Sequence, residues 1–262
     1  MHPLSPRFPT TRRSRLAAIL AAAALLSTAC SAAAGAPGPP SPSSGMTLSR
    51  LIPASIADLP LRDQHGHVID LAGLRGRTVM IVPFLTLCQD MCPFDTGNLV
   101  QVQRALDQKG AGSKVVLLEV SVDPGRDTPA RLAAYAHLTG ASWELATEPQ
   151  ATLSAFEQYF GWYVHTDPEG DAPGVDWWTH QPLTYDVDHS DGYTLIDPSG
   201  VVRFETGASP DYSGSLSPTL RHFLSPLGQS RVAHPPQPGW TPTNALATLG
   251  WMLHENIPPA SS

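Results

Sequence analysis

The chain has 262 residues, with 16 Lys and Arg against 23 Asp and Glu, so its formal net charge is −7. This length fits one globular domain with tails better than two full domains. The acidic balance argues against a nucleic-acid-binding surface. The sequence also has no run of 18 or more apolar residues that would span a bilayer.

The N-terminal segment has the pattern of an export signal. Residues 1–15 contain four arginines and no acid, residues 16–26 are apolar, and small residues follow them. A basic region, a short apolar region and a small-residue exit are typical of a secretory signal, and the apolar part is too short for a membrane helix. We therefore predict an export signal over residues 1–29 and a protein that leaves the cytoplasm.

A cysteine ends this segment. Residues 26–30 (LSTAC) resemble a bacterial lipobox, whose cysteine becomes the lipidated first residue, although Ser27 departs from the usual Leu. The resemblance implies lipidation of Cys30 and an anchor on the outer face of the cell membrane. Ordinary signal cleavage within residues 29–36 is the alternative. Residues 30–50, rich in Ala, Gly, Pro and Ser, are expected to form a flexible tether.

Strands and helices alternate through the remainder, which predicts a mixed α/β sheet with helices on both faces in a domain over residues 51–226. A Pro-rich C-terminal extension over residues 227–262 follows, in which we expect a short helix at 243–254 that packs on the domain, touches the membrane surface or contacts a partner. In chain order the expected elements are a buried strand at 77–85, a helix beginning at Pro93, a buried strand at 114–122, a helix at 129–138, a short strand at 143–146, a helix at 149–160, a hairpin of 193–196 with 201–204, and a helix at 217–223.

Cys88 and Cys92 form a close pair, CQDMC, between the first buried strand and the helix that follows it. A disulfide over so few residues would constrain the unfolded chain little. The pair is better suited to binding a soft metal or to cycling between dithiol and disulfide. Because Cys92 lies at the expected helix start, where N–H groups are free, we expect its thiolate to be favoured.

Four segments of the chain are informative together: LRDQHGHVIDLAGLRGRTVMIV, TLCQDMCP, VSVDPGRDTP and VDHSDGYTLIDPSG. They resemble the SCO (SenC) family over about residues 54–225, in that family's order and spacing. The resemblance implies a thioredoxin-like fold and a copper site made by a CxxxC pair and a distant histidine, here Cys88, Cys92 and His189. It also implies that the client is the Cu_A site of a terminal oxidase.

The donor chemistry agrees with that implication. Thiolates are soft donors suited to Cu(I), and an imidazole also suits Cu(II), so three such ligands can hold either state and leave one position open. Among ten histidines, His189 matches the family segment, and His180 is the competitor. The second ring nitrogen of His189 needs an acceptor, for which Asp186 and Asp188 are candidates unless they are solvated.

Other functions are compatible with the same residues. A thiol–disulfide oxidoreductase could use Cys88 and Cys92 to reduce the cysteines of a partner's metal site. A peroxiredoxin-like peroxidase is disfavoured because Thr86 stands two residues before Cys88, where a threonine three residues before is wanted. An exported zinc-binding protein is chemically possible, but the surrounding motifs do not support it.

Overall fold

The computed structural model describes residues 37–171, 173–211, 216–235 and 239–261. The expected export signal and Cys30 lie outside these residues. None of the helices in the described ranges combines the length and apolar character that a bilayer span requires.

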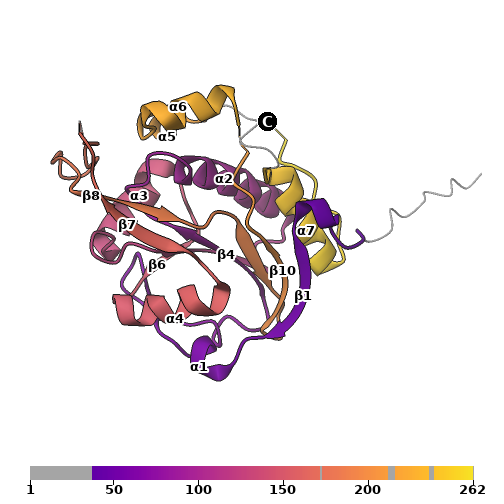
Figure 1. Ribbon diagram of the computed structural model, residues 1–262. Coiled ribbons are helices and arrows are strands. Elements are labelled where there is room, and N and C mark those ends of the chain that lie inside the picture. The colour runs from indigo at the N-terminus through magenta and orange to yellow at the C-terminus, as the bar shows by residue number, and fades with distance from the viewer. Residues whose placement is uncertain (1–36, 172, 212–215, 236–238, 262) are drawn as a thin grey trace, which may run out of the picture. The chain divides into compact units, whose positions relative to one another are not determined.

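An eight-stranded sheet forms the centre of the domain, in the order β1-β10-β9-β4-β5-β6-β2-β3, and β7 and β8 pair separately. Figure 1 shows both sets of strands with the helices around them. The strands are β1 (Met46–Leu51), β2 (Leu61–Asp63), β3 (Val68–Ile69), β4 (Thr78–Phe84), β5 (Val115–Ser121), β6 (Glu144–Thr147), β7 (Val164–Pro168), β8 (Tyr185–His189), β9 (Tyr193–Ile196) and β10 (Val201–Thr206).

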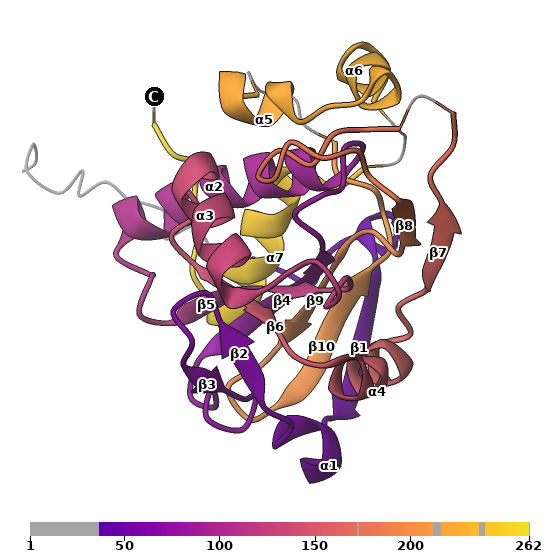
Figure 2. The ribbon, with the colours of Figure 1, turned by 90° about the vertical axis from the view of Figure 1, so that its left-hand side faces the viewer.

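Helices cover both faces of this sheet, as the sequence predicts (Figures 1 and 2). Side chains of α2, α3 and α7 pack with alternate residues of β4 such as Met80 and Val82. Side chains of α1 and α4 pack with Val79 and Ile81, which point to the other face. The helices are α1 (Ala54–Ala57), α2 (Cys92–Lys109), α3 (Pro129–Thr139), α4 (Gln150–Phe160), α5 (Pro218–His222), α6 (Pro226–Ala233) and α7 (Pro242–Leu253), with a 3₁₀ turn at Pro42–Ser44.

The topology is thioredoxin-like. Strands β4, β5 and β6 are parallel, and the connections between them carry α2 and α3. The β9–β10 hairpin adds antiparallel strands beside β4. Helix α7 then packs on α2 and completes the layer of helices over that face. The carboxyl end of β4 and the start of α2 therefore meet at one edge of the sheet, where open α/β sheets place their sites.

The expected strands and helices are all present, with boundaries that differ by two residues or fewer. The hydrophobic pattern succeeds here because β4 and β5 are buried along their whole length. Thr128 caps α3 by accepting a hydrogen bond from the Arg131 N–H, as the Thr-Pro pair predicts.

The start of the sheet differs from expectation. Strand β1 begins at Met46 and pairs with β10, so the sheet starts inside the segment 30–50 that we expected to be a tether. Its side chains are mostly exposed, so its pairing depends on backbone hydrogen bonds and leaves no burial pattern in the sequence. In the expected extension 227–262, the short helix predicted at 243–254 is present as α7, and it packs on the domain with Leu246 and Leu249 fully buried.

Candidate metal centre

Three potential metal ligands converge at the carboxyl end of β4. The sulfurs of Cys88 and Cys92 and a ring nitrogen of His189 all lie within 4.8 Å of one another. Cys88 lies in the turn after β4, Cys92 is the first residue of α2, and His189 is the last residue of β8. The structure therefore brings together the three residues that the sequence singles out, although 97 positions separate Cys92 from His189.

The start of α2 sets the position of both cysteines. Pro93 follows Cys92 in the first turn, where its missing N–H costs no hydrogen bond. The Cys88 sulfur accepts hydrogen bonds from the backbone N–H groups of Met91, at 3.4 Å, and of Cys92, at 3.3 Å. The Cys88 sulfur thus takes the place that a capping oxygen occupies at other helix starts.

The two thiols differ in acidity. The hydrogen bond from the Cys92 thiol, together with the neighbouring His189, holds the pKa of Cys88 well below its usual range, despite the opposing effect of burial. Burial raises the pKa of Cys92, whose side chain is 0% exposed, and the adjacent Cys88 raises it further. The expectation that Cys92 carries the favoured thiolate is therefore wrong, because the Cys92 thiol donates to the Cys88 sulfur and Cys92 is itself fully buried.

His189 faces the thiols through Nε2, which lies 3.4 Å from the Cys92 sulfur. Its Nδ1 lies 2.8 Å from the backbone carbonyl oxygen of Ser190, so an Nδ1–H donates there and fixes the orientation of the ring. The expected acceptors, Asp186 and Asp188, do not fill this role. Burial alone would lower the pKa of His189, but its contacts with Cys88 raise the pKa above the usual value.

His180, the competing ligand, is exposed and does not belong to this cluster. It lies in the β7–β8 loop (residues 169–184) and has a φ of 59°. Among the described residues, Cys88, Cys92 and His189 form the one group of three or more His, Cys, Asp or Glu side chains whose ligand atoms lie close enough to hold one metal ion.

A cavity of about 440 Å³ opens beside Cys88 and His189. Five carboxylate side chains line it, against one arginine, Arg231 of α6. Burial raises the pKa of Asp191, although the hydrogen bond from Ser209 and the nearby His189 and Arg231 oppose the increase. Sequence reasoning missed Ser225, Arg231 and His234 in this wall, since they belong to a segment without a motif. The five acidic residues are Asp90, Glu169, Asp186, Asp188 and Asp191.

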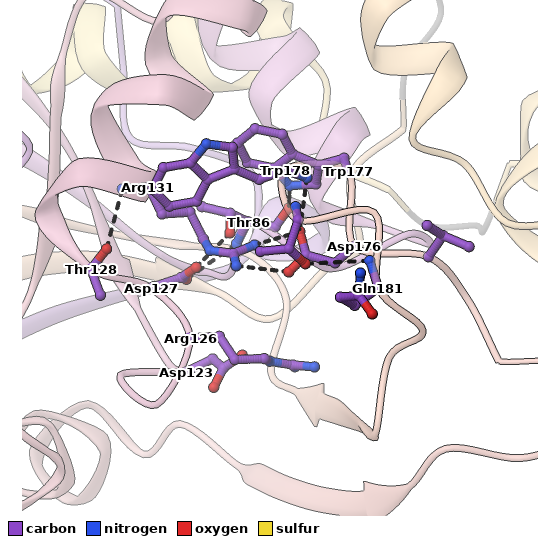
Figure 3. Close-up of polar contacts among 12 residues, drawn as sticks. Thr86, Asp123, Arg126, Asp127, Thr128, Arg131, Asp176, Trp177, Trp178 and Gln181 are labelled. Carbon is purple, nitrogen blue, oxygen red and sulfur yellow. Dashed lines mark hydrogen bonds and ion pairs between the residues drawn. The ribbon is translucent and has the colours of Figure 1, made fainter.

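The β7–β8 loop lies near the candidate site and is hydrogen-bonded to the residues that follow β4 (Figure 3). The indole N–H of Trp177 donates to the carbonyl oxygen of Thr86 at 2.8 Å. Arg131 of α3 forms two hydrogen bonds with the Asp176 carboxylate, at 2.9 and 2.7 Å, and both side chains are largely buried. Planar pairing of this kind fixes the loop next to the turn that carries Cys88.

The donor set fits copper. Two sulfurs and one imidazole nitrogen suit Cu(I) and Cu(II), whereas structural zinc sites use four protein ligands. Both cysteines are free thiols in the structure. The cavity beside Cys88 leaves room for a further ligand from another molecule. The fold and the site together define a thioredoxin-like domain with a Cys₂His cluster.

Comparison with known families agrees with this class. The SCO1/SenC family model matches residues 54–211, so the chain belongs to the SCO1/SenC family. The mitochondrial "Protein SCO2 homolog" of Bos taurus is 31% identical over 152 residues, which cover 55% of this chain and 50% of the relative. That of Homo sapiens is 29% identical over 176 residues, which cover 64% and 59%. The chain thus spans about half to three fifths of these relatives' length.

Among solved structures, Bradyrhizobium japonicum ScoI with copper bound is similar to this chain at 26% identity. The similarity covers 65% of this chain and 96% of that chain, with a TM-score of 0.47.

Proposed function

We propose that this protein is a copper metallochaperone that binds one copper ion through Cys88, Cys92 and His189. The observation that carries the proposal is the convergence of these three donor atoms within 4.8 Å. Membership of the SCO1/SenC family supports the same reading. The lowered pKa of Cys88 favours the thiolate, which is the form of cysteine that binds metals.

Copper is the cargo in this proposal. Three ligands leave one coordination position free, and Cys88 borders the cavity through which another ligand can enter. An ion in such a site can be bound by donor and acceptor at once, so it moves without being released into water. The surplus of carboxylates around the cavity attracts a cation before it reaches the sulfurs.

We further propose that the acceptor is the Cu_A site of a terminal oxidase, and that the protein acts outside the cytoplasm on a lipid anchor at Cys30. The family resemblance supports the client. The basic and apolar pattern of residues 1–29 supports export, and the lipobox-like residues 26–30 support the anchor. Loss of membrane association in a Cys30→Ala variant, measured by cell fractionation, tests the anchor.

Copper titration of the reduced protein tests the central proposal. One equivalent should bind, and Cu(II) should give sulfur-to-copper charge-transfer bands. His189→Ala should weaken binding by more than roughly 100-fold, since the loss of a group that only orients a ligand already costs 10–100-fold. His180→Ala is the matched control and should bind like the wild type. A wild-type protein that binds no copper when reduced would refute the proposal.

A thiol–disulfide oxidoreductase is the second candidate, favoured by the partly exposed Cys88 with its lowered pKa. The Cys88 thiolate would attack a partner disulfide, which breaks the partner's S–S bond, joins one of its sulfurs to Cys88 in a mixed disulfide and releases the other as a thiolate that takes up the Cys92 proton. The Cys92 thiolate would then attack the Cys88 sulfur and break the mixed disulfide, which leaves a Cys88–Cys92 disulfide and releases the remaining partner sulfur as a thiolate that is protonated by water. Rapid reduction of a model disulfide by protein that fails to bind copper would favour this function.

A further inference from the structure

Residues 216–235 contain α5 and α6 and lie beyond the end of the family match at residue 211. In Figures 1 and 2 these two helices lie over α2, the helix that begins at Cys92. Phe223, directly after α5, anchors the segment in the core: its ring stacks on Tyr135 at 5.9 Å between centroids and contacts Trp177 at 5.7 Å. The segment is therefore packed firmly beside the cysteine pair.

The start of α6 contacts both residues that follow Cys88. The backbone N–H of Ser225 donates to the Gln89 carbonyl oxygen at 2.9 Å. The Ser225 hydroxyl donates to the Asp90 carboxylate and accepts the N–H of Gly228 at 3.0 Å. Asp90 thus lies at the positive end of the α6 dipole, where a carboxylate is stabilised.

Gly228 allows this close approach. A β-carbon at this position would lie 2.5 Å from the Gln89 carbonyl oxygen, so any other residue would push α6 away from the CxxxC turn. On its other side, Gln89 donates from Nε2 to the Val175 carbonyl oxygen of the β7–β8 loop at 3.3 Å. The CxxxC turn is therefore held from two sides by segments distant in sequence.

The residues between two cysteines control the separation of their sulfurs. Two sulfurs that share one metal ion, each about 2.3 Å from it, lie roughly 4 Å apart. A disulfide requires them at about 2.05 Å. Cys88 and Cys92 must approach each other to form the disulfide, and the turn that contains Gln89 and Asp90 joins them. In the structure both thiols are free and α6 contacts this turn, so the contacts are present in the dithiol form.

We propose that Ser225 and Gly228 are positioning residues that hold the CxxxC turn in its reduced, metal-ready geometry. The predicted effect on copper binding rests on the proposed function, whereas the predicted effect on the thiol–disulfide equilibrium of Cys88 and Cys92 does not. Oxidation of the pair passes two electrons and two protons to glutathione disulfide, which becomes two glutathione molecules. The equilibrium constant of this exchange measures the preference of the turn directly.

The test is equilibration of the full chain in glutathione buffers, with the fraction of free thiol measured by alkylation. Ser225→Ala removes the hydrogen bond to the Asp90 carboxylate and should shift the equilibrium about tenfold toward the disulfide. The reduction potential of the Cys88–Cys92 pair would then be about 30 mV more negative than in the wild type. Gly228→Ala should shift it in the same direction. Ser225→Thr keeps the hydroxyl and should restore most of the wild-type value. Ser230→Ala is the matched control on α6, because the Ser230 hydroxyl donates to the Leu227 carbonyl oxygen and not to the turn.

An equilibrium constant for Ser225→Ala within twofold of that for Ser230→Ala would overturn the proposal, and circular dichroism of both variants shows whether they are folded. Copper competition on the same variants separates the two proposals. If wild-type protein binds no copper but Ser225→Ala shifts the thiol equilibrium, the positioning role stands and the copper function fails. If wild-type protein binds copper and neither Ser225→Ala nor Gly228→Ala changes the thiol–disulfide equilibrium, the copper function stands and the positioning role fails.

Discussion

Replacing Glu119 by Gln tests how burial controls charge in the core beneath the site. Glu119 lies in the central strand β5 and is 0% exposed. Its Oε2 accepts a hydrogen bond from the Trp143 indole N–H at 2.8 Å, while Oε1 has no hydrogen-bond partner among the described residues. Burial raises the pKa of this carboxyl to about 8, from 4.5 when it is exposed.

The sign and size of the effect follow from these two pKa values. Between pH 4.5 and 8 the folded protein keeps a proton on Glu119 that the unfolded chain loses. The free energy of unfolding therefore falls by about 1.4 kcal/mol for each unit of rising pH. The contribution is fully present below pH 4.5 and is lost as the pH rises through 8. From pH 5 to 8 this amounts to roughly 4 kcal/mol.

Glutamine has nearly the same shape and no charge, so Glu119→Gln removes this pH dependence and keeps an acceptor for Trp143. The wild-type protein should exceed the variant in stability most at pH 5, and the difference should shift by about 4 kcal/mol in favour of the variant by pH 8. Urea unfolding of the reduced, metal-free proteins at each pH unit, followed by circular dichroism, gives the difference.

Glu144→Gln is the matched control, because Glu144 lies on the neighbouring strand β6 and is partly exposed. If the difference between the wild-type and Glu119→Gln proteins stays constant from pH 5 to 8, Glu119 does not titrate as its burial requires, and the reasoning fails.

Three further outcomes are expected. In the metal-free protein, thiolate absorbance near 240 nm should persist below pH 9, which is the usual pKa of an exposed thiol. This absorbance should disappear in Cys88→Ser but remain in Cys92→Ser. An equal loss of absorbance in both variants would contradict the assignment of the thiolate to Cys88. Asp176→Ala should lower the free energy of unfolding by about 3–5 kcal/mol in urea, because it leaves Arg131 buried and unpaired, and a loss below about 1 kcal/mol would show that the pair does not act as a buried one. Gly192→Ala should destabilise the protein by more than about 2 kcal/mol in thermal unfolding, since φ is +93° and a β-carbon would collide with a backbone carbonyl of β10, and an unchanged melting temperature would contradict this.

Much of the fold could be predicted because its central elements have strong local patterns. Strands β4 and β5 are buried and mostly apolar along their length, and Pro93 and Pro129 mark helix starts. Strand β1 could not be predicted in the same way, because it pairs through its backbone and buries almost no side chain. Helix α6 is short and amphipathic only in part, and its packing depends on the distant CxxxC turn.

The site residues were predictable to a similar extent. Cys88 and Cys92 belong to one local strand–turn–helix unit, so their spacing predicts their proximity. The hydrogen-bond acceptor of His189 Nδ1 could not be predicted in this way, because it is the backbone carbonyl oxygen of Ser190, and backbone groups leave no residue-type signal in the sequence. The acidity of the two thiols depends on which sulfur accepts the hydrogen bond from the other and on how deeply each is buried, and spacing alone does not decide this.

His189 belongs to the two-stranded β7–β8 ribbon, whereas the cysteines follow β4 of the main sheet. An ion bound by all three would act as a cross-link between two separately hydrogen-bonded sheets. Binding of a metal ion should therefore slow amide hydrogen exchange along Val164–Pro168 and Tyr185–His189 more than in the centre of β4. The β7–β8 ribbon would then be more rigid in the metal-bound protein than in the metal-free protein.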